Sequence, residues 1–277
     1  MGMRISTNVS AINAQRTMVG SQRAIGKSME QLSSGSRINK AADDAAGLAI
    51  SENLKSQIRS LGQAGRNAND GISMVQTAEG GLSEISNILT RMRELGVQAS
   101  SDTIGDTERG FLDKEVQQLK AEAQRITQTT KFGTTKLLDG SGDKFDFQVG
   151  INNDDDADRI SFNAGETNAT IGELGIDGFD FTGKAGAQSA LEQIDKAQSQ
   201  VNGYRANLGA LQNRLQSTVD NLGVQHENIS AANSRIRDTD IAAATAESTR
   251  NQVLLQSNTA VLGQANQIPN MALRLIG

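Results

Sequence analysis

Hydrophobic positions in the C-terminal third of the chain repeat every seven residues without a break. The positions of this repeat are Ile194, Val201, Leu208, Leu215, Leu222, Ile229 and Ile236. A seven-residue repeat is typical of a helix that packs one narrow apolar stripe against other helices. The pattern predicts a single helix over residues 194–236, roughly 65 Å long at 1.5 Å per residue.

The apolar pattern is interrupted over residues 237–252 and then returns as a second stripe. Its members are Leu254, Val261, Ile268 and Leu275. Pro269 lies inside this stripe, and proline lacks the backbone donor that an inner helical turn needs. We therefore expect the last helix to bend or end near residue 268.

The N-terminal half shows the same kind of pattern. Ile5, Ile12 and Val19 are spaced by seven, with Val9 beside them. Apolar residues between positions 54 and 95 then follow one another in steps of mostly three, four or seven, which predicts a helix of more than 40 residues. Its five glycines, each costing up to about 1 kcal/mol relative to alanine, suggest that neighbouring segments approach closely. They are Gly62, Gly65, Gly71, Gly80 and Gly81.

The middle of the chain has a different period. A shorter helix is expected where one face carries Phe111, Leu112, Val116, Leu119 and Ile126. The stretch KFDFQVGI alternates apolar and polar residues, and RISF follows it after the acidic turn NNDDDAD. Alternation on both sides of a turn predicts a β-hairpin. A glycine-rich loop over 172–188 leads into the long C-terminal helix.

These elements predict a mainly α-helical protein of long antiparallel helices, with coiled-coil packing and a small β-hairpin region. Long helices that carry single stripes hide little surface within one chain. The two terminal stripes in particular have few partners in the same chain. We expect other copies of the chain to complete them, as in a polymer.

Composition narrows the function further. Of the 277 residues, 36% are hydrophobic and 3% are aromatic, which suits helix seams better than a thick core. The chain has no cysteine, so disulfides, zinc–thiolate sites and cysteine nucleophiles are excluded. The net charge of −5 without a basic cluster argues against nucleic acid as a partner. We expect no membrane insertion and no cleaved secretion signal, because no apolar run is long enough.

Candidate catalytic groups are few. Adjacent carboxylates at Asp43 and Asp44 resemble an acid pair, but they fit the first turn of a helix beginning near Ala41, where negative charge is favourable. Asn39 or another polar residue would cap that helix. The segment SSGSR before it lacks the spacing of a phosphate loop.

Two candidate metal sites are equally weak. The run Asp154 to Asp158 lacks the glycine and the final glutamate of a calcium loop, so a solvated turn is the better interpretation. His226 is the single histidine and cannot form a histidine-based metal site alone. We therefore expect no enzyme activity, no cofactor and no metal, and a helical structural protein remains.

Four stretches carry a resemblance to a known family. They are the motif from Ile5 to Ser51 ending in LSSGSRINKAADDAAGLAIS, NDGISMVQTAEGGLSEISNILTRMRELGVQAS at 69–100, KFGTTKLLDG at 131–140, and the segment 227–277. In these motifs the chain resembles bacterial flagellin along nearly its whole length. The centre, about 141–190, is where flagellins vary, and here it is short.

The resemblance implies a two-part architecture. Residues 1–43 and 237–277 would pair as the coiled coil of an inner tube, and 44–236 would form an outer-tube domain with a β-hairpin region at about 141–175. The subunits would polymerise into the helical flagellar filament used for swimming. Arg37, Asn39, Asp43 and Asp44 would then form the joint between the two parts.

Partners and location also follow from the resemblance. The protein would leave the cell through the flagellar type III export apparatus and be extracellular. An export chaperone, hook-associated junction proteins and a cap protein would bind it. The motif around Arg91 and Leu95, with Glu115 on the next helix, resembles the part of flagellin that an animal Toll-like receptor contacts.

Alternatives from other classes remain at this point. A minor flagellin or a hook–filament junction protein would share the terminal helices. A flagellin with a protease domain in its centre would be an enzyme, but the chain has no HExxH motif and a short centre.

Overall fold

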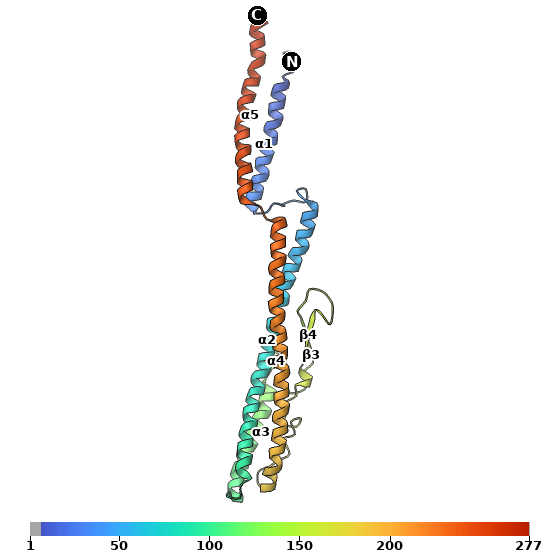
Figure 1. Ribbon diagram of the computed structural model, residues 1–277, viewed down its shortest axis with the longest axis vertical. Coiled ribbons are helices and arrows are strands. Elements are labelled where there is room, and N and C mark those ends of the chain that lie inside the picture. The colour runs from blue at the N-terminus through green and yellow to red at the C-terminus, as the bar shows by residue number, and fades with distance from the viewer. Residues whose placement is uncertain (1–6, 277) are drawn as a thin grey trace. The chain divides into compact units, whose positions relative to one another are not determined.

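The computed structural model describes residues 7–276, with side chains for residues 7–267. The chain forms two compact units: unit 1 is Met1–Gln57 with Asn228–Gly277, and unit 2 is Ile58–Glu227. The α-helices of the described part are α1 (Val9–Ser34), α2 (Ala45–Ala99), α3 (Asp106–Thr129), α4 (Lys184–Arg237) and α5 (Ile241–Ile276). The mainly α-helical fold class is confirmed (Figure 1).

The strands form two small antiparallel pairs. One pair is β1 (Lys131–Phe132) with β2 (Thr135–Lys136), and the other is β3 (Lys144–Gln148) with β4 (Arg159–Asn163). The 3₁₀ turn η1 (Ala164–Glu166) follows β4. Phe145 lies opposite Phe162 and Phe147 opposite Ile160, so the hairpin predicted from alternation is confirmed. The β1–β2 pair was not predicted, because two-residue strands are too short to show alternation.

The core of unit 2 explains why the long helices are stable. The seven-residue stripe of α4 is buried from Ile194 to Leu222. Its members from Ile194 to Leu215 pack in one cluster with Leu82, Ile85 and Leu89 of α2, which are fully buried. Burying each such side chain contributes about 1.5–3 kcal/mol, which offsets the weak helix propensity of the glycines.

Two of the five α2 glycines that the sequence pattern singled out mark close contacts, as expected. A Cβ on Gly71 would lie 3.2 Å from the ring of Phe147, and one on Gly81 would lie 2.7 Å from Leu138. The β3–β4 hairpin and the segment after β2 can therefore lie directly on the helix. The other three meet no neighbouring segment: Gly62, Gly65 and Gly80.

Three expectations about the helices were wrong. Helix α2 begins at Ala45 rather than near Ala41, because Asp44 ends the preceding loop as described below. Phe111 is 63% exposed and does not belong to the buried face of α3, whose buried residues are Arg109, Val116, Lys120, Ala123 and Thr127. Helix α5 continues through Pro269 to Ile276, so of the bend or end expected near residue 268 the end is wrong.

The hydrogen bonds around Ala265 explain how α5 tolerates its proline. In an α-helix the N–H of residue 269 would donate to the carbonyl of residue 265, and Pro269 has no N–H. The side-chain Nδ2 of Asn8 donates to that carbonyl of Ala265 over 2.7 Å. Because a partner from another helix replaces the missing donor, the carbonyl is satisfied and the helix can go on.

Candidate functional site: the terminal helices and their joint

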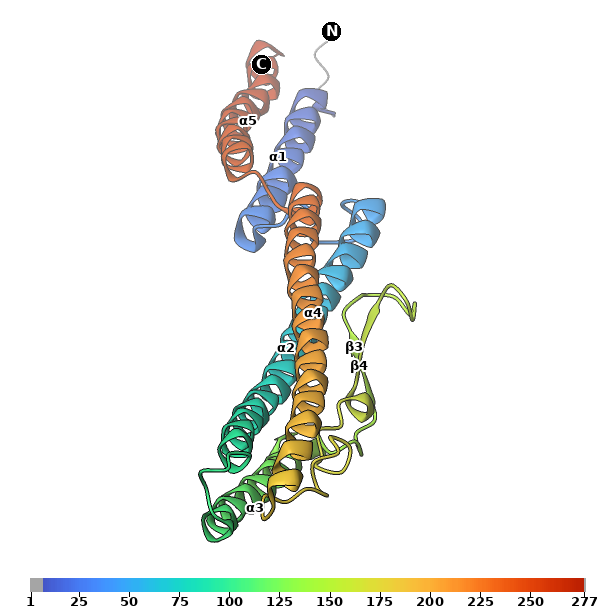
Figure 2. The same ribbon diagram turned by 60° about the horizontal axis from the view of Figure 1, so that its bottom comes forward.

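The two terminal helices meet along a seam of small side chains. Helices α1 and α5 lie side by side in both views (Figures 1 and 2). The buried residues of α1 are Ala14, Ser21 and Ser28, spaced by seven. Among the side chains of α5 that the structure describes, up to residue 267, the buried ones are Ala244, Ser248 and Ala265. Small residues allow two backbones to approach closely, but they bury little apolar surface.

The large apolar side chains of α1 face away from this seam. Val9 and Ile12 are 55% and 54% exposed, and Val19 is 39% exposed. Ile12 precedes Ala14 by two residues, which is about 200° around a helix of 3.6 residues per turn. The seven-residue repeat seen in the sequence is therefore real, but it belongs to the outer face of the helix pair.

Helix α5 shows the same arrangement. Leu254 and Val261 are 45% and 48% exposed. Of the other predicted stripe residues, Ile5 lies outside the described residues, and the side chains of Ile268 and Leu275 also lie outside them. We call the exposed residues Val9, Ile12, Val19, Leu254 and Val261 the outer stripe. Five large apolar side chains of these two helices are thus left exposed.

Asp44 starts helix α2. Its Oδ1 accepts a hydrogen bond from the backbone N–H of Gly47 over 2.8 Å, which is the geometry of a helix cap. A Cβ on Gly47 would lie 2.8 Å from Ile38, whose side chain is 1% exposed. The sequence DDAAG thus combines a cap with the one residue small enough to lie against it. Asn39 is not the cap, because its Nδ2 donates to the carbonyl of Glu30.

Asp43 holds the loop before α2. Its Oδ2 accepts from the backbone N–H groups of Asn39 and Lys40, over 3.4 and 3.2 Å. Its Oδ1 lies 3.0 Å from Nζ of Lys27 on α1. The hydrogen bond from Lys27, followed by that from the Lys40 backbone, holds the pKa of Asp43 below its ordinary value. Both acids therefore serve the loop, and neither is arranged as one half of a catalytic pair.

The two connecting segments of unit 1 pair with each other. The backbone N–H of Arg37 donates to the carbonyl of Arg237 over 2.6 Å, and that of Thr239 donates to the carbonyl of Gly35 over 3.0 Å. Gly35 ends α1 with a φ of 68°, which favours glycine. The segments form an isolated antiparallel bridge that joins the end of α1 to the end of α4.

Side chains strengthen this bridge on both sides. The guanidinium of Arg37 donates to the carbonyl of Ile236 over 2.7 Å, so its charge lies at the carboxyl end of α4, where a cation is favourable. Arg237 donates to Oε1 of Glu52 over 2.5 Å and lowers the pKa of that carboxyl. The residues predicted for the joint, Arg37, Asn39, Asp43 and Asp44, all lie in this short region of unit 1.

Sequence reasoning did not find Asn8, Lys27, Glu52 or Arg237 as members of the site. A signal existed for Asn8, because asparagine is a preferred cap and its Oδ1 accepts from the N–H of Ala11 at the start of α1. The other three act through contacts between helices, which spacing along the chain does not reveal.

Comparison with known proteins identifies what this arrangement belongs to. Residues 5–143 match the family model of the bacterial flagellin N-terminal helical region, and residues 191–276 match that of the C-terminal helical region. A flagellin of Halalkalibacterium halodurans is 46% identical over 274 residues, covering 99% of this chain and 100% of that protein. The chain belongs to the bacterial flagellin family.

Other comparisons agree. A Bacillus subtilis flagellin is 41% identical over 304 residues, covering 99% of this chain and 100% of that protein. The crystal structure of Bacillus cereus flagellin matches with a TM-score of 0.51 at 31% identity, over 61% of this chain and 94% of that one. A putative hook-associated protein of Vibrio parahaemolyticus matches at 14% identity with a TM-score of 0.58, over 71% of this chain and 100% of that one, and shares the fold only.

This flagellin is a structural subunit of the bacterial flagellar filament, in a short form without variable outer domains. The comparisons do not favour the junction-protein alternative. Within the described residues, no helix contains an apolar stretch long enough to cross a membrane.

The predicted receptor residues of this flagellin lie in different environments. Arg91 is exposed, and its guanidinium lies 2.9 Å from both Glu94 and Glu115, which raises its pKa. Leu95 is 1% exposed and belongs to the core of unit 2. Arg91 and Glu115 thus form one surface pair, whereas the Leu95 side chain is not at the surface of this unit.

The remaining candidates have structural roles. Asp154 accepts hydrogen bonds from the N–H groups of Asp156 and Ala157, and Asp158 accepts from that of Asp154, so these carboxylates shape the hairpin turn. His226 is exposed on α4. Across the described residues, no group of three or more acidic or histidine side chains is placed to hold a metal ion.

Proposed function

We propose that copies of this flagellin polymerise by covering one another's outer stripe. In this proposal residues 1–43 and 237–277 form the inner tube, and 44–236 form the outer tube. The observation that carries it is the placement of side chains on α1 and α5. Small residues fill the contact between the two helices, and large apolar residues remain exposed. Contacts of this head-to-tail kind do not close on themselves and give an open helical filament.

Truncation tests the proposal. Removing residues 254–277 deletes the α5 half of the outer stripe without touching unit 2. We expect the truncated chain to form no filaments by electron microscopy, while the fluorescence of Tyr204, the single tyrosine, still reports a folded unit 2. Normal filaments from the truncated chain would refute the role of the stripe.

We further propose that the subunit is exported and works outside the cell. The exposed apolar residues of α5 support a chaperone that covers them before assembly, because such surfaces otherwise promote aggregation. Hook-associated junction proteins and a cap protein would contact the same helices at the ends of the filament. A binding assay of a flagellar export chaperone against the full chain and the chain lacking 254–277 tests the chaperone step.

Recognition by a Toll-like receptor is proposed for the surface pair Arg91 and Glu115. The pair is exposed and lies on two neighbouring helices, which suits a contact from outside. Arg91→Ala should lower the response of a receptor reporter assay to purified monomer. An unchanged response would remove Arg91 from the contact.

We propose no catalytic role for this chain, since its family is structural. Asp43 and Asp44, the best acid pair in the sequence, are both engaged by backbone N–H groups. Peptidase activity in the purified protein would contradict this.

A further inference from the structure

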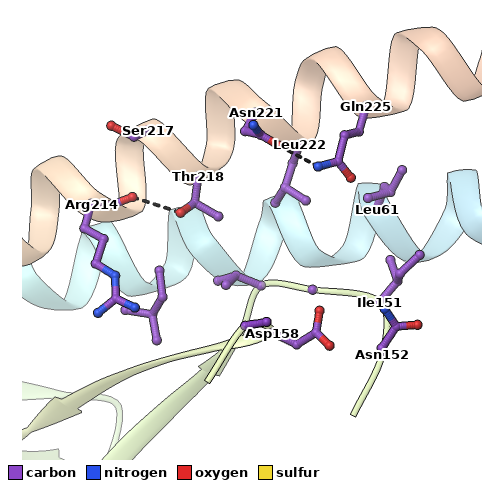
Figure 3. A pocket seen from close by; sticks show the side chains of 14 residues that line it. Leu61, Ile151, Asn152, Asp158, Arg214, Ser217, Thr218, Asn221, Leu222 and Gln225 are labelled. Atoms are coloured by element: carbon purple, nitrogen blue, oxygen red, sulfur yellow. Dashed lines mark hydrogen bonds between the residues drawn. The ribbon is translucent and has the colours of Figure 1, made fainter. Parts of the chain in front are cut away.

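Unit 2 contains an open cleft beneath its β-hairpin. The cleft lies between the β3–β4 turn and α4, with Leu61 of α2 at its base, and encloses about 490 Å³ (Figure 3). Its floor is apolar, formed by the buried side chains of Leu61, Ile160 and Leu222. Hollows of this size suit bulky groups of a bound molecule.

The rim of the cleft is acidic on the hairpin side. Asp158 lines it, and Asp154, Asp155 and Asp156 are exposed on the adjoining turn. Only Asp155 pairs with a cation, Arg159, among the described residues. Arg214 on α4 forms part of the opposite wall, and no ion pair of its guanidinium with a carboxylate is present within the described part of the chain.

A matching projection lies elsewhere on unit 2. Phe111 is 63% exposed and is the one aromatic side chain among the large hydrophobic residues exposed in the described structure. Nζ of Lys114, one turn later, lies 5.7 Å from the centre of its ring. Lys114 has no carboxylate partner within the described residues. An apolar ring beside a free ammonium group therefore stands out from α3.

The projection and the cleft lie toward opposite ends of unit 2. Both views place the turn between α2 and α3 at one end of the unit and the β3–β4 hairpin toward the other (Figures 1 and 2). Phe111 is in the second turn of α3, whereas Leu61 and Gln225 are near the first and last residues of unit 2. A contact between the two features therefore joins two copies head to tail.

We propose that Phe111 and Lys114 of one subunit insert into the hairpin cleft of the next subunit. The ring would cover the apolar floor, and Arg214 would lie near its electron-rich face, a favourable arrangement. The ammonium of Lys114 would meet the exposed carboxylate of Asp156 on the hairpin turn. This inference rests on the proposed polymerisation and names a specific contact that unit 2 adds to it.

Disulfide trapping tests the contact directly, because the chain contains no cysteine of its own. Phe111→Cys and Thr218→Cys chains are mixed in equal amounts, polymerised with a wild-type seed, and oxidised. Thr218 lies on the α4 wall and hydrogen-bonds only to its own helix, at the carbonyl of Arg214. We expect a cross-linked dimer on a non-reducing gel that contains one chain of each kind.

The matched control replaces Phe111→Cys with Gln118→Cys. Gln118 is exposed on the same face of α3 but lies about 10 Å farther along the helix. Since two cysteines bridge only when their Cα atoms are within about 7 Å, this mixture should yield little dimer. Equal yields from the two mixtures, or dimers of Thr218→Cys with itself, would overturn the proposal.

A charge exchange covers the case in which the cysteine variants assemble poorly. Lys114→Glu should raise the critical concentration for polymerisation about threefold, within the range of an exposed ion pair. Adding Asp156→Lys to the same chain should restore it, because each subunit then meets its neighbour with the charges exchanged. No restoration would argue against the contact. Failure of the wild-type chain to polymerise would instead refute the proposed function.

Discussion

Asp43 and Asp44 are neighbours in sequence and have separate tasks in the joint. Asp44 caps α2 from its N-terminal end, whereas Asp43 fastens the preceding loop to Lys27 of α1. The sequence indicates that this acid pair marks a helix start. It does not indicate which acid is the cap, because both have a suitable side chain and the difference depends on where the loop turns.

Asp44→Ala should destabilise the start of α2. Loss of a cap costs about 1 kcal/mol, so we expect a lower midpoint of thermal unfolding by circular dichroism. Asp44→Asn is the control, because asparagine caps as well as aspartate does. If alanine and asparagine behaved alike, the hydrogen bond to Gly47 would not be what stabilises the helix.

The pair of Asp43 and Lys27 predicts a pH dependence. The pKa of Asp43 is lowered in the folded state, so its stabilising effect is complete above its ordinary pKa of about 4 and is lost as the pH falls through the lowered value. Asp43→Asn should therefore unfold at a lower temperature than the wild type at about pH 5. The difference should shrink as the pH falls below that ordinary value toward the lowered pKa, because the wild-type carboxyl then becomes protonated as well. A constant difference would contradict this assignment.

At the scale of elements, the outer stripe separates assembly from folding. Ile12→Ser with Val19→Ser removes two large apolar groups that have no role in the α1–α5 seam. Since burying each is worth about 1.5–3 kcal/mol, we expect the critical concentration for polymerisation to rise at least about tenfold. The helix content of the monomer should stay the same.

The matched control for the stripe is Gln15→Ser with Gln22→Ser. Both glutamines are exposed on α1 and are polar already. Their replacement should leave the critical concentration near that of the wild type. Equal effects of the two double variants would show that serine itself disturbs α1.

Long helices were predictable from the sequence, because stripes such as that of α4 persist over many turns. The direction in which each apolar stripe faces was less predictable. The repeat of Ile12 and Val19 looks the same in the sequence whether these residues are buried within the chain or against another copy. The seam of Ala14, Ser21 and Ser28 gives no hydrophobic signal at all. Contacts such as that between Asn8 and Ala265 depend on the pairing of distant segments and require the structure.

At the scale of the molecule, both units leave apolar surface for a second copy. Unit 1 exposes the outer stripe. Unit 2 exposes Phe111 near one of its ends and has the open hairpin cleft toward the other. The two contacts are independent in the chain, so their contributions to polymerisation should add when the residues are far apart. Combining the stripe double variant with Lys114→Glu should multiply the two increases in critical concentration. A combined effect no larger than the greater single one would indicate a shared step.

The seam of small side chains has a mechanical consequence. Alanine and serine side chains project little from each helix. A shift of α1 along α5 therefore loses little side-chain packing between the two helices. A polar contact at one point is a known way to fix the register of paired helices, and the bond from Asn8 to the Ala265 carbonyl has that position near one end. Asn8→Ala should therefore broaden the range of axial repeats seen in filaments by electron microscopy. The proline that interrupts the hydrogen bonding of α5 would then be what lets one helix hold the other in place.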